Sequence, residues 1–237
     1  MKQERLSVIS CRDLNGTVFE LKLAGASVMR AGQFVELSVP GFFLRRPISV
    51  ADSDESALTL LIKTVGEGTK KLRTLAAGEV LDALTGLGNG FALTGERPLL
   101  AGGGIGCAPL YKLAKEFAAA GIRPHAVLGF RNAEEVYYAE EFARYCDVTV
   151  ATDDGSLGVK GNAVSAAADI PHDVFYACGP QVMLRAAAGS LGRGQVSLEA
   201  RMGCGFGACM GCSIVTTHGY ARVCKEGPVF GAEEVVW

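Results

Sequence analysis

The chain has 237 residues, about half of them hydrophobic and a fifth charged, which is typical of a globular protein with room for two compact units. Its formal net charge of −2 gives no electrostatic basis for binding nucleic acid. No apolar run reaches the roughly 18 residues that span a membrane, and the charged N-terminus does not resemble a signal peptide. We therefore expect a cytoplasmic protein with neither nucleic acid nor membrane as a partner. In that compartment its eight cysteines favour metal binding or redox chemistry over disulfides.

The first 95 residues contain short apolar runs separated by Gly, Asp and Asn. Several short strands with regular turn signals predict a small antiparallel β-barrel or sandwich. The expected strands include residues 16–23, 33–39, 47–52 and 57–65.

From residue 96 to residue 197, apolar runs alternate with segments rich in Ala and Glu. Strands that alternate with helices predict a doubly wound parallel α/β sheet. The expected strands are residues 97–103, 125–130, 147–152 and 173–179, and the expected helices are residues 108–120, 134–145, 162–169 and 181–190.

The last part, residues 198–237, is rich in Cys and Gly and contains four cysteines spaced C-x4-C-x2-C-x11-C. This spacing begins like the plant-type [2Fe–2S] ligand set, whereas structural zinc favours two separate close pairs. Glycines around the thiols supply the backbone angles that a tight loop requires. We predict a [2Fe–2S] cluster, with zinc or unrelated thiols as alternatives. Its ligands would be Cys204, Cys209, Cys212 and Cys224.

A glycine-rich turn follows the first strand of the sheet region and leads into a helix near Pro109. Such a turn lets a pyrophosphate approach a helix N-terminus, although it lacks the usual dinucleotide spacing and could be a tight packing turn. A second turn follows the last predicted strand, and ligands of such sheets bind at the strand ends. The residues are Gly102, Gly103, Gly104 and Gly106 in the first turn, and Cys178, Gly179 and Pro180 in the second.

Two arginines, Arg45 and Arg46, precede Pro47 in an otherwise apolar run. A phosphate would satisfy such a guanidinium by a bidentate contact, and Ser49 could donate a further hydrogen bond. A Gly-Thr turn at Thr69 has another shape suited to anions, although this threonine could be only a helix N-cap. Phosphate binding and a purely structural turn both stay open here.

The motifs R-P-x-S, G-x-G-T, AGGGIG and CGP together resemble the ferredoxin–NADP⁺ reductase superfamily, which binds FAD on a barrel and a nicotinamide dinucleotide on a sheet. The stretches EARMGCGFGACMGC and RVCKEGPVF are more specific. Through them the chain resembles, over essentially its whole length, the electron-transfer subunits of NAD-dependent (type B) dihydroorotate dehydrogenases.

This resemblance implies that Arg46, Gly68 and Thr69 hold the FAD pyrophosphate and that Ser49 faces the flavin. The implied FAD residues are Arg46, Pro47, Ile48, Ser49, Ile62, Lys63, Thr64, Gly68 and Thr69, and the implied NAD residues are Gly102, Gly103, Gly104, Gly106, Cys178, Gly179 and Pro180. Many relatives place an aromatic residue where Ile48 stands, so the flavin's stacking partner is not identified. We expect Trp237 to pack against the body or a partner.

The resemblance also implies a function. Electrons would pass from an FMN-containing catalytic subunit through the [2Fe–2S] cluster and FAD to NAD⁺, in pyrimidine (UMP) biosynthesis and in a 2+2 heterotetramer. The chain is too short to contain the (β/α)8 barrel of that partner, which takes about 250 residues by itself. No catalytic acid or base is expected in this chain, and the three histidines are interpreted as structural or surface residues.

Two other functions stay open. One is an FAD/[2Fe–2S] reductase subunit of another assembly, such as a ferredoxin–NADP⁺ oxidoreductase or a hydrogenase. The other is a non-catalytic iron–sulfur sensor. A modest preference for NADH over NADPH is predicted from Glu134 and Glu135, which would repel a 2′-phosphate, against Arg131, which would attract one.

Overall fold

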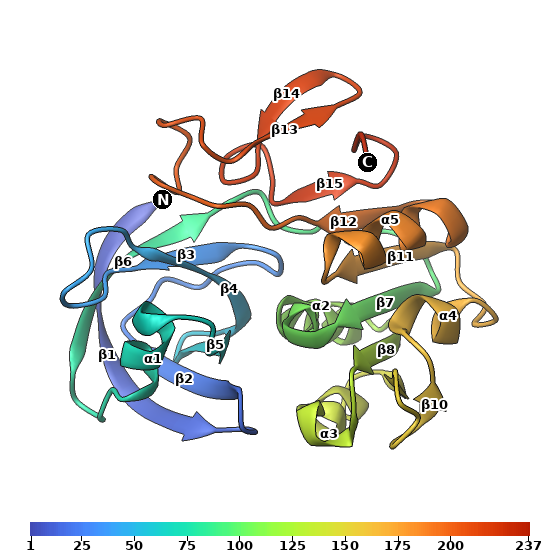
Figure 1. Ribbon diagram of the computed structural model, residues 1–237, viewed down its shortest axis with the longest axis horizontal. Coiled ribbons are helices and arrows are strands. Elements are labelled where there is room, and N and C mark those ends of the chain that lie inside the picture. The colour runs from blue at the N-terminus through green and yellow to red at the C-terminus, as the bar shows by residue number, and fades with distance from the viewer.

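The N-terminal strands close into an antiparallel barrel in the computed structural model, which describes all 237 residues. Neighbouring strands follow the order β1-β2-β5-β4-β3-β6 around the barrel (Figure 1). Leucine side chains such as Leu21, Leu37 and Leu60 are buried in its core. The predicted barrel is confirmed, with strands β1 (Lys2–Asp13), β2 (Val18–Ala24), β3 (Phe34–Leu37), β4 (Arg46–Ser53), β5 (Leu58–Lys63) and β6 (Val80–Leu87), and a short helix α1 (Glu67–Arg73).

A seven-stranded sheet forms the second half, in the order β10-β9-β8-β7-β11-β12-β15. All neighbouring pairs are parallel except β12 with β15, which is antiparallel. The predicted doubly wound sheet is therefore confirmed. No helix is long and apolar enough to cross a membrane. The elements are β7 (Pro98–Gly103), η1 (Gly104–Gly106), α2 (Cys107–Ala119), β8 (His125–Phe130), β9 (Asp147–Thr152), β10 (Val159–Lys160), α4 (Ala163–Ala167), β11 (Val174–Cys178), α5 (Gln181–Ser190), β12 (Gly194–Ser197) and β15 (Val229–Gly231).

The single helix predicted over residues 134–145 is wrong in its extent. A 3-10 turn, η2 (Ala133–Glu135), is followed by a shorter helix, α3 (Ala139–Ala143). Between them Tyr138 adopts a left-handed φ of 62°, which is rare for a residue with a Cβ. Tertiary hydrogen bonds explain the break, because Tyr137 donates to the carbonyl of Gly104 while Tyr138 donates to Glu20 in the barrel.

The C-terminal part lies across the end of both halves (Figure 1). It contains a loop with three of the four predicted cluster cysteines and then a hairpin of β13 (Ser213–Thr216) and β14 (Gly219–Arg222). The chain then returns to the sheet, where β15 pairs with β12. The sequence did not predict this added strand.

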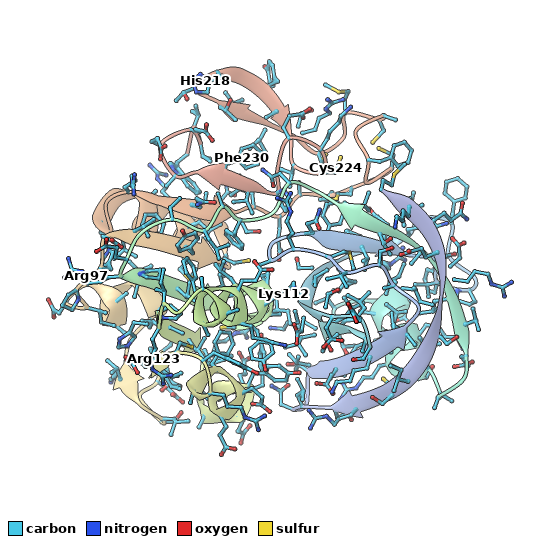
Figure 2. The ribbon with its side chains drawn as sticks, turned by 180° about the vertical axis from the view of Figure 1, so that it is seen from behind. Arg97, Lys112, Arg123, His218, Cys224 and Phe230 are labelled. Carbon is cyan, nitrogen blue, oxygen red and sulfur yellow. The ribbon has the colours of Figure 1, made fainter.

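Helix α2 packs against the barrel strand β4, and Figure 2 shows Lys112 between the two halves. The buried Lys112 ammonium donates to the carbonyl of Ser53 at 2.7 Å, and Lys115 pairs with Asp52. The carboxylate of Glu116 accepts from the backbone amide of Ala31 at 3.0 Å. These contacts fix the sheet relative to the barrel.

The buried carboxylate of Glu20 on β2 forms a second link between the barrel and the sheet. It is also the subject of the first prediction. Burial opposes its ionisation, but hydrogen bonds from Arg12 and Tyr138 outweigh burial and hold its pKa below the ordinary value of 4.5. The ionised carboxylate of Glu20 therefore stabilises the fold above about pH 4.5. This stabilisation is lost as the pH falls through the lowered pKa of Glu20. We expect Glu20→Gln to lower the free energy of unfolding at pH 7 by about 1.5–3 kcal/mol.

Thermal unfolding between pH 3 and pH 7 measures this effect. The Tm difference between the parent and Glu20→Gln should shrink towards pH 3, while Glu55→Gln on an exposed turn should differ little from the parent throughout. A difference that stays constant over this range would contradict the assignment of the ion pair.

Candidate functional site

Two cavities meet where the barrel faces the sheet. The barrel-side cavity, of about 350 Å³, lies between β4 and β5 and the start of α2. The sheet-side cavity, of about 520 Å³, lies at the carboxyl ends of the parallel strands. Lys63, Ile105 and Glu199 line both cavities. Ligands bound in the two cavities would therefore meet at these three residues.

Most of the residues predicted to bind FAD line the barrel-side cavity. They are Arg46, Pro47, Ile48, Ser49, Ile62, Lys63 and Thr69. Two others lie outside it. Thr64 accepts a hydrogen bond from Arg73, and Gly68 packs beneath the guanidinium of Arg46, where a Cβ would collide with it. The Thr69 hydroxyl donates to the carbonyl of Gly66 and accepts from its amide, so it also caps α1.

The structure gives a physical reason for the difference between the two adjacent arginines, of which the resemblance had singled out Arg46. Arg45 pairs with Asp82, so its charge is neutralised within the barrel. Arg46 makes no salt bridge; its guanidinium lies 4.8 Å from the ring centroid of Phe42 and above Gly68 at the start of α1. A half-buried guanidinium without a carboxylate partner, beside a helix N-terminus, is suited to an anion such as a phosphate.

Phe34 is the one aromatic residue that lines the barrel-side cavity. It is buried on β3, and its backbone pairs with that of Ser49 on β4. The sequence did not single it out, because a phenylalanine in a short strand is usually core. Trp237 lies elsewhere: it packs on the sheet and its indole N–H donates to the carbonyl of Ala232. Its expected packing against the body is confirmed.

The two predicted dinucleotide turns lie side by side, because β7 and β11 are neighbours in the sheet. A Cβ at Gly106 would collide with the backbone of Cys178, so this glycine allows close packing. Gly103, Gly104, Gly179 and Pro180 line the sheet-side cavity, Gly106 and Cys178 line the barrel-side cavity, and Gly102 lines neither and packs against Cys107. The glycine turn thus serves packing and also borders the cavity.

Charged residues at the ends of β8 and β9 complete the sheet-side cavity. Arg131 forms a salt bridge of 3.5 Å with Glu135, and both line the cavity together with Asp153. Glu134 does not line it. The sequence analysis missed Asp153, whose only signal was a position directly after a predicted strand. It also missed Glu199, because the strand before it, β12, was not predicted.

The four tail cysteines lie in two pairs. The amide of Cys209 donates to the sulfur of Cys204 at 3.4 Å, and the amide of Cys224 donates to the sulfur of Cys212 at 3.4 Å. No group of three or more His, Cys, Asp or Glu side chains is arranged around one point as ligands of a single metal ion. Two pairs match a [2Fe–2S] cluster, in which each iron takes two thiolates.

The loop around Cys204 already favours a thiolate. Burial raises the pKa of this thiol, but backbone amides of Cys209, Phe206 and Ala208 point at the sulfur and lower its pKa to about 6. Gly205 and Gly207 adopt φ angles of 73° and 93°, which allow the loop to turn its amides inward. This amide cradle suits the sulfur ligand of an iron–sulfur cluster.

Glu36 on β3 lies beneath this loop. Its side chain packs against Gly205, and its Oε1 atom is buried without a hydrogen-bond partner. Burial raises its pKa to about 7, despite the opposing charge of Arg45. The barrel therefore presents a carboxyl group, easily neutralised, to the underside of the cluster loop.

The outer side of the cluster loop is open. Cys212 and Cys224 are buried, whereas Cys209 is exposed. Phe206 and Met210 leave 43% and 53% of their surface exposed. Leu198, Glu199, Ala200 and Met202, which lead into the loop, line the barrel-side cavity. One short segment thus connects this cavity to the first cluster ligand, Cys204.

Comparison with known proteins identifies the family. The sequence profile of the iron–sulfur cluster binding domain of dihydroorotate dehydrogenase B matches residues 199–236. The dihydroorotate dehydrogenase B (NAD(+)) electron transfer subunits of Bacillus cereus (strain B4264) and Bacillus mycoides (strain KBAB4) are each 40% identical to this chain, over 100% of it and 99% of their own length. The chain belongs to this family.

Among solved structures, reductases share the fold of this dihydroorotate dehydrogenase B family member. A chain of an NADH-dependent reduced ferredoxin-NADP oxidoreductase superposes with a TM-score of 0.89 and 29% identity, over 98% of this chain and 90% of that one. An Amycolatopsis cytochrome P450 reductase superposes with a TM-score of 0.71 and 26% identity, over 80% of this chain and 65% of that one.

The second prediction concerns Arg46. If this guanidinium holds the FAD pyrophosphate, Arg46→Ala should weaken FAD binding roughly 10- to 150-fold, because a hydrogen bond to a charged group contributes about 1.5–3 kcal/mol. Flavin retained after gel filtration and the Kd of re-added FAD measure the effect. Arg45→Ala is the matched control and should keep FAD, because Arg45 is already paired with Asp82. Equal FAD affinity in the Arg46 variant and the parent would rule out this role.

The third prediction concerns the nucleotide. Since Arg131 is paired with Glu135 and Asp153 adds a negative charge, kcat/KM should be higher for NADH than for NADPH. Glu135→Gln frees Arg131 and should lower the ratio of kcat/KM for NADH to kcat/KM for NADPH. Glu134→Gln lies outside the cavity and should leave this ratio unchanged. A preference of the parent protein for NADPH would mean that the attraction of Arg131 dominates.

Proposed function

We propose that this chain is the electron transfer subunit of an NAD-dependent dihydroorotate dehydrogenase. It would receive electrons from an FMN-containing catalytic subunit at a [2Fe–2S] cluster and deliver them through FAD to NAD⁺. The observation that carries the proposal is that a segment with four paired thiols adjoins two neighbouring cavities, in a chain that belongs to this family.

The barrel-side cavity is proposed to hold FAD. Arg46 would bind its pyrophosphate, Ser49 would donate to the ring system, and Phe34 offers the one aromatic face. Hydride transfer moves two electrons together, whereas a cluster takes one electron at a time. Bound FAD would link the two, because a flavin can transfer electrons in either way. The apolar wall formed by Ile48 and Ile62 would exclude water from the ring.

The sheet-side cavity is proposed to hold NAD⁺. Gly103 and Gly104 would allow the pyrophosphate to approach the sheet, and the turn at Gly179 would border the nicotinamide end. Because Lys63 and Glu199 line both cavities, they would lie where the nicotinamide meets the flavin. Their role would be to orient the two rings for hydride transfer.

The four cysteines, Cys204, Cys209, Cys212 and Cys224, are proposed to ligate the cluster. Inward-pointing amides would hydrogen-bond its sulfurs, and the open side of the loop would face the partner. Membership in a family of electron transfer subunits implies a catalytic partner subunit. We propose that this partner contains FMN and assembles with the chain as a 2+2 heterotetramer, docked on Phe206 and Met210.

This proposal places the chain in pyrimidine (UMP) biosynthesis, at the step that oxidises dihydroorotate to orotate. A reducing compartment such as the cytoplasm is proposed because all eight cysteines are free and four must be available as thiolates. The proposed domains are a FAD-binding barrel at 1–95, an NAD-binding unit at 96–197 and a cluster-binding segment at 198–237. The last of these also returns β15 to the sheet.

A second candidate is a reductase subunit of a ferredoxin-linked assembly, which the TM-score of 0.89 to a ferredoxin-NADP oxidoreductase chain favours. That chain is 29% identical, against 40% for the dihydroorotate dehydrogenase subunits. We therefore rank it second.

The deciding experiment is an orotate assay with each subunit alone and with both mixed. This chain alone should pass electrons from NADH to artificial dyes and form no orotate. Addition of the catalytic subunit from the same organism should give orotate coupled to reduction of NAD⁺.

Cys209→Ser is the matched variant for the electron route. It should lose the visible absorption of the iron–sulfur cluster and the NAD-linked orotate formation together. Two irons per chain are expected in the parent protein. Orotate formed by this chain alone, or zinc in place of iron after growth with sufficient iron, would refute the proposal.

A further inference from the structure

The stretch that runs from the cluster loop through the hairpin has no charged side chain of its own, although Arg222 and Lys225 lie against Gly207 in the loop. From Met202 to Ala221 there is no Asp, Glu, Lys or Arg, although a fifth of the whole chain is charged. More than half of these residues are exposed. An exposed surface without charges is unusual for a protein in water, and depletion of charge is characteristic of the centre of protein–protein interfaces.

The hairpin within this segment exposes a row of apolar side chains. Val215 on β13 is directly opposite Tyr220 on β14. On its other side the chain end bridges Thr216 to Val235, and the amide of Val236 donates to the carbonyl of Val215. Thr216 and Val235 are buried, so their neighbours Val215 and Val236 share the opposite, outer face.

This outer row is large and open. The exposed fractions are 82% for Tyr220, 48% for Val215 and 55% for Val236. Residues directly opposite one another on a sheet face lie in contact distance, so the three side chains form a continuous strip across three chain segments. A continuous apolar strip indicates an interaction site, whereas single exposed apolar residues do not.

The strip is joined to the cluster loop. The hairpin lies between the ligands Cys212 and Cys224, and Figure 2 shows it extending from Cys224 at its base to His218 near its tip. Arg222, at the end of β14, donates to the carbonyl of Gly207 in the cluster loop at 2.6 Å and pairs with Glu226. A partner seated on the strip would therefore also reach the exposed side of the loop at Phe206 and Met210.

We infer that the outer face of the β13–β14 hairpin, formed by Val215, Tyr220 and Val236, is a docking surface for the catalytic subunit. This inference rests on the proposed function. Cys212 and Cys224 are buried whereas Cys209 is exposed, so the side of the loop that carries Cys209 is the open approach to the cluster for another protein. The electron-donating subunit is accordingly the occupant, and it meets the strip with an apolar, uncharged surface of its own.

The test measures the affinity of the loaded subunit for the catalytic subunit by calorimetry. Val215→Lys and Tyr220→Ser should each raise the Kd at least tenfold, because the first buries an unpaired charge in an apolar interface and the second removes a tyrosine, a residue type that often dominates binding. Val80→Lys is the matched control: Val80 is also a strand valine, 46% exposed, but lies on β6 of the barrel. It should leave the Kd within about twofold. Cluster absorbance and dye reduction by NADH should be unchanged in Val215→Lys.

Several outcomes would overturn the inference. If the parent chain binds the catalytic subunit and both hairpin variants bind equally well, the inference fails while the proposed function stands. If the parent chain does not bind that subunit, both fail. If the variants instead dissociate a dimer of this chain without changing the Kd, a second copy covers the strip.

If Val215→Lys misfolds and loses its cluster, hydrogen exchange of the parent protein tests the inference instead. Backbone amides of residues 213–222 should exchange more slowly in the complex than in the free subunit. Unchanged exchange in this hairpin would overturn the inference without any variant.

Discussion

The packing of α2 against the barrel is the contact on which the whole site depends. It buries the ammonium of Lys112, a costly step that is offset by the hydrogen bond to Ser53 and the nearby carboxylate of Glu116 at 3.7 Å. Because α2 begins directly after the glycine turn, this contact also brings Gly106 and Pro109 to the barrel-side cavity. The two cavities adjoin only while the two halves hold this position.

The C-terminal segment is held to the same place at both of its ends. It leaves the sheet at Ser197, and it returns at Val229, which pairs directly with Ser197. Between these residues the chain forms one wall of the barrel-side cavity and then the cluster loop. The two ends of this segment cannot separate from the sheet unless β15 is released from β12. The sheet thereby anchors both ends of the segment that joins the proposed flavin and cluster sites.

Charge is distributed sparingly around the proposed electron route. Arg45 is neutralised by Asp82, Glu36 lies buried with a raised pKa, and the cluster loop carries no charge. Arg46 and Lys63 are left as cations without a carboxylate partner at the barrel-side cavity. Backbone amides that point at the sulfurs are a main influence on the potential of a cluster. The same lack of charge on the outer side suits a surface that another subunit covers.

The sequence by itself determined the barrel, the doubly wound sheet and the four-cysteine motif, because these follow from local periodicity and from spacing along the chain. Without the family resemblance it did not separate Arg45 from Arg46, since their partners Asp82 and Gly68 are distant in sequence. Nor did it identify Phe34 or Glu199, because a lone aromatic or acid has no local signature of a cavity. The added strand β15, the meeting of the two cavities and the apolar row on the hairpin all arise from contacts between remote segments. Only the tertiary structure decides such contacts.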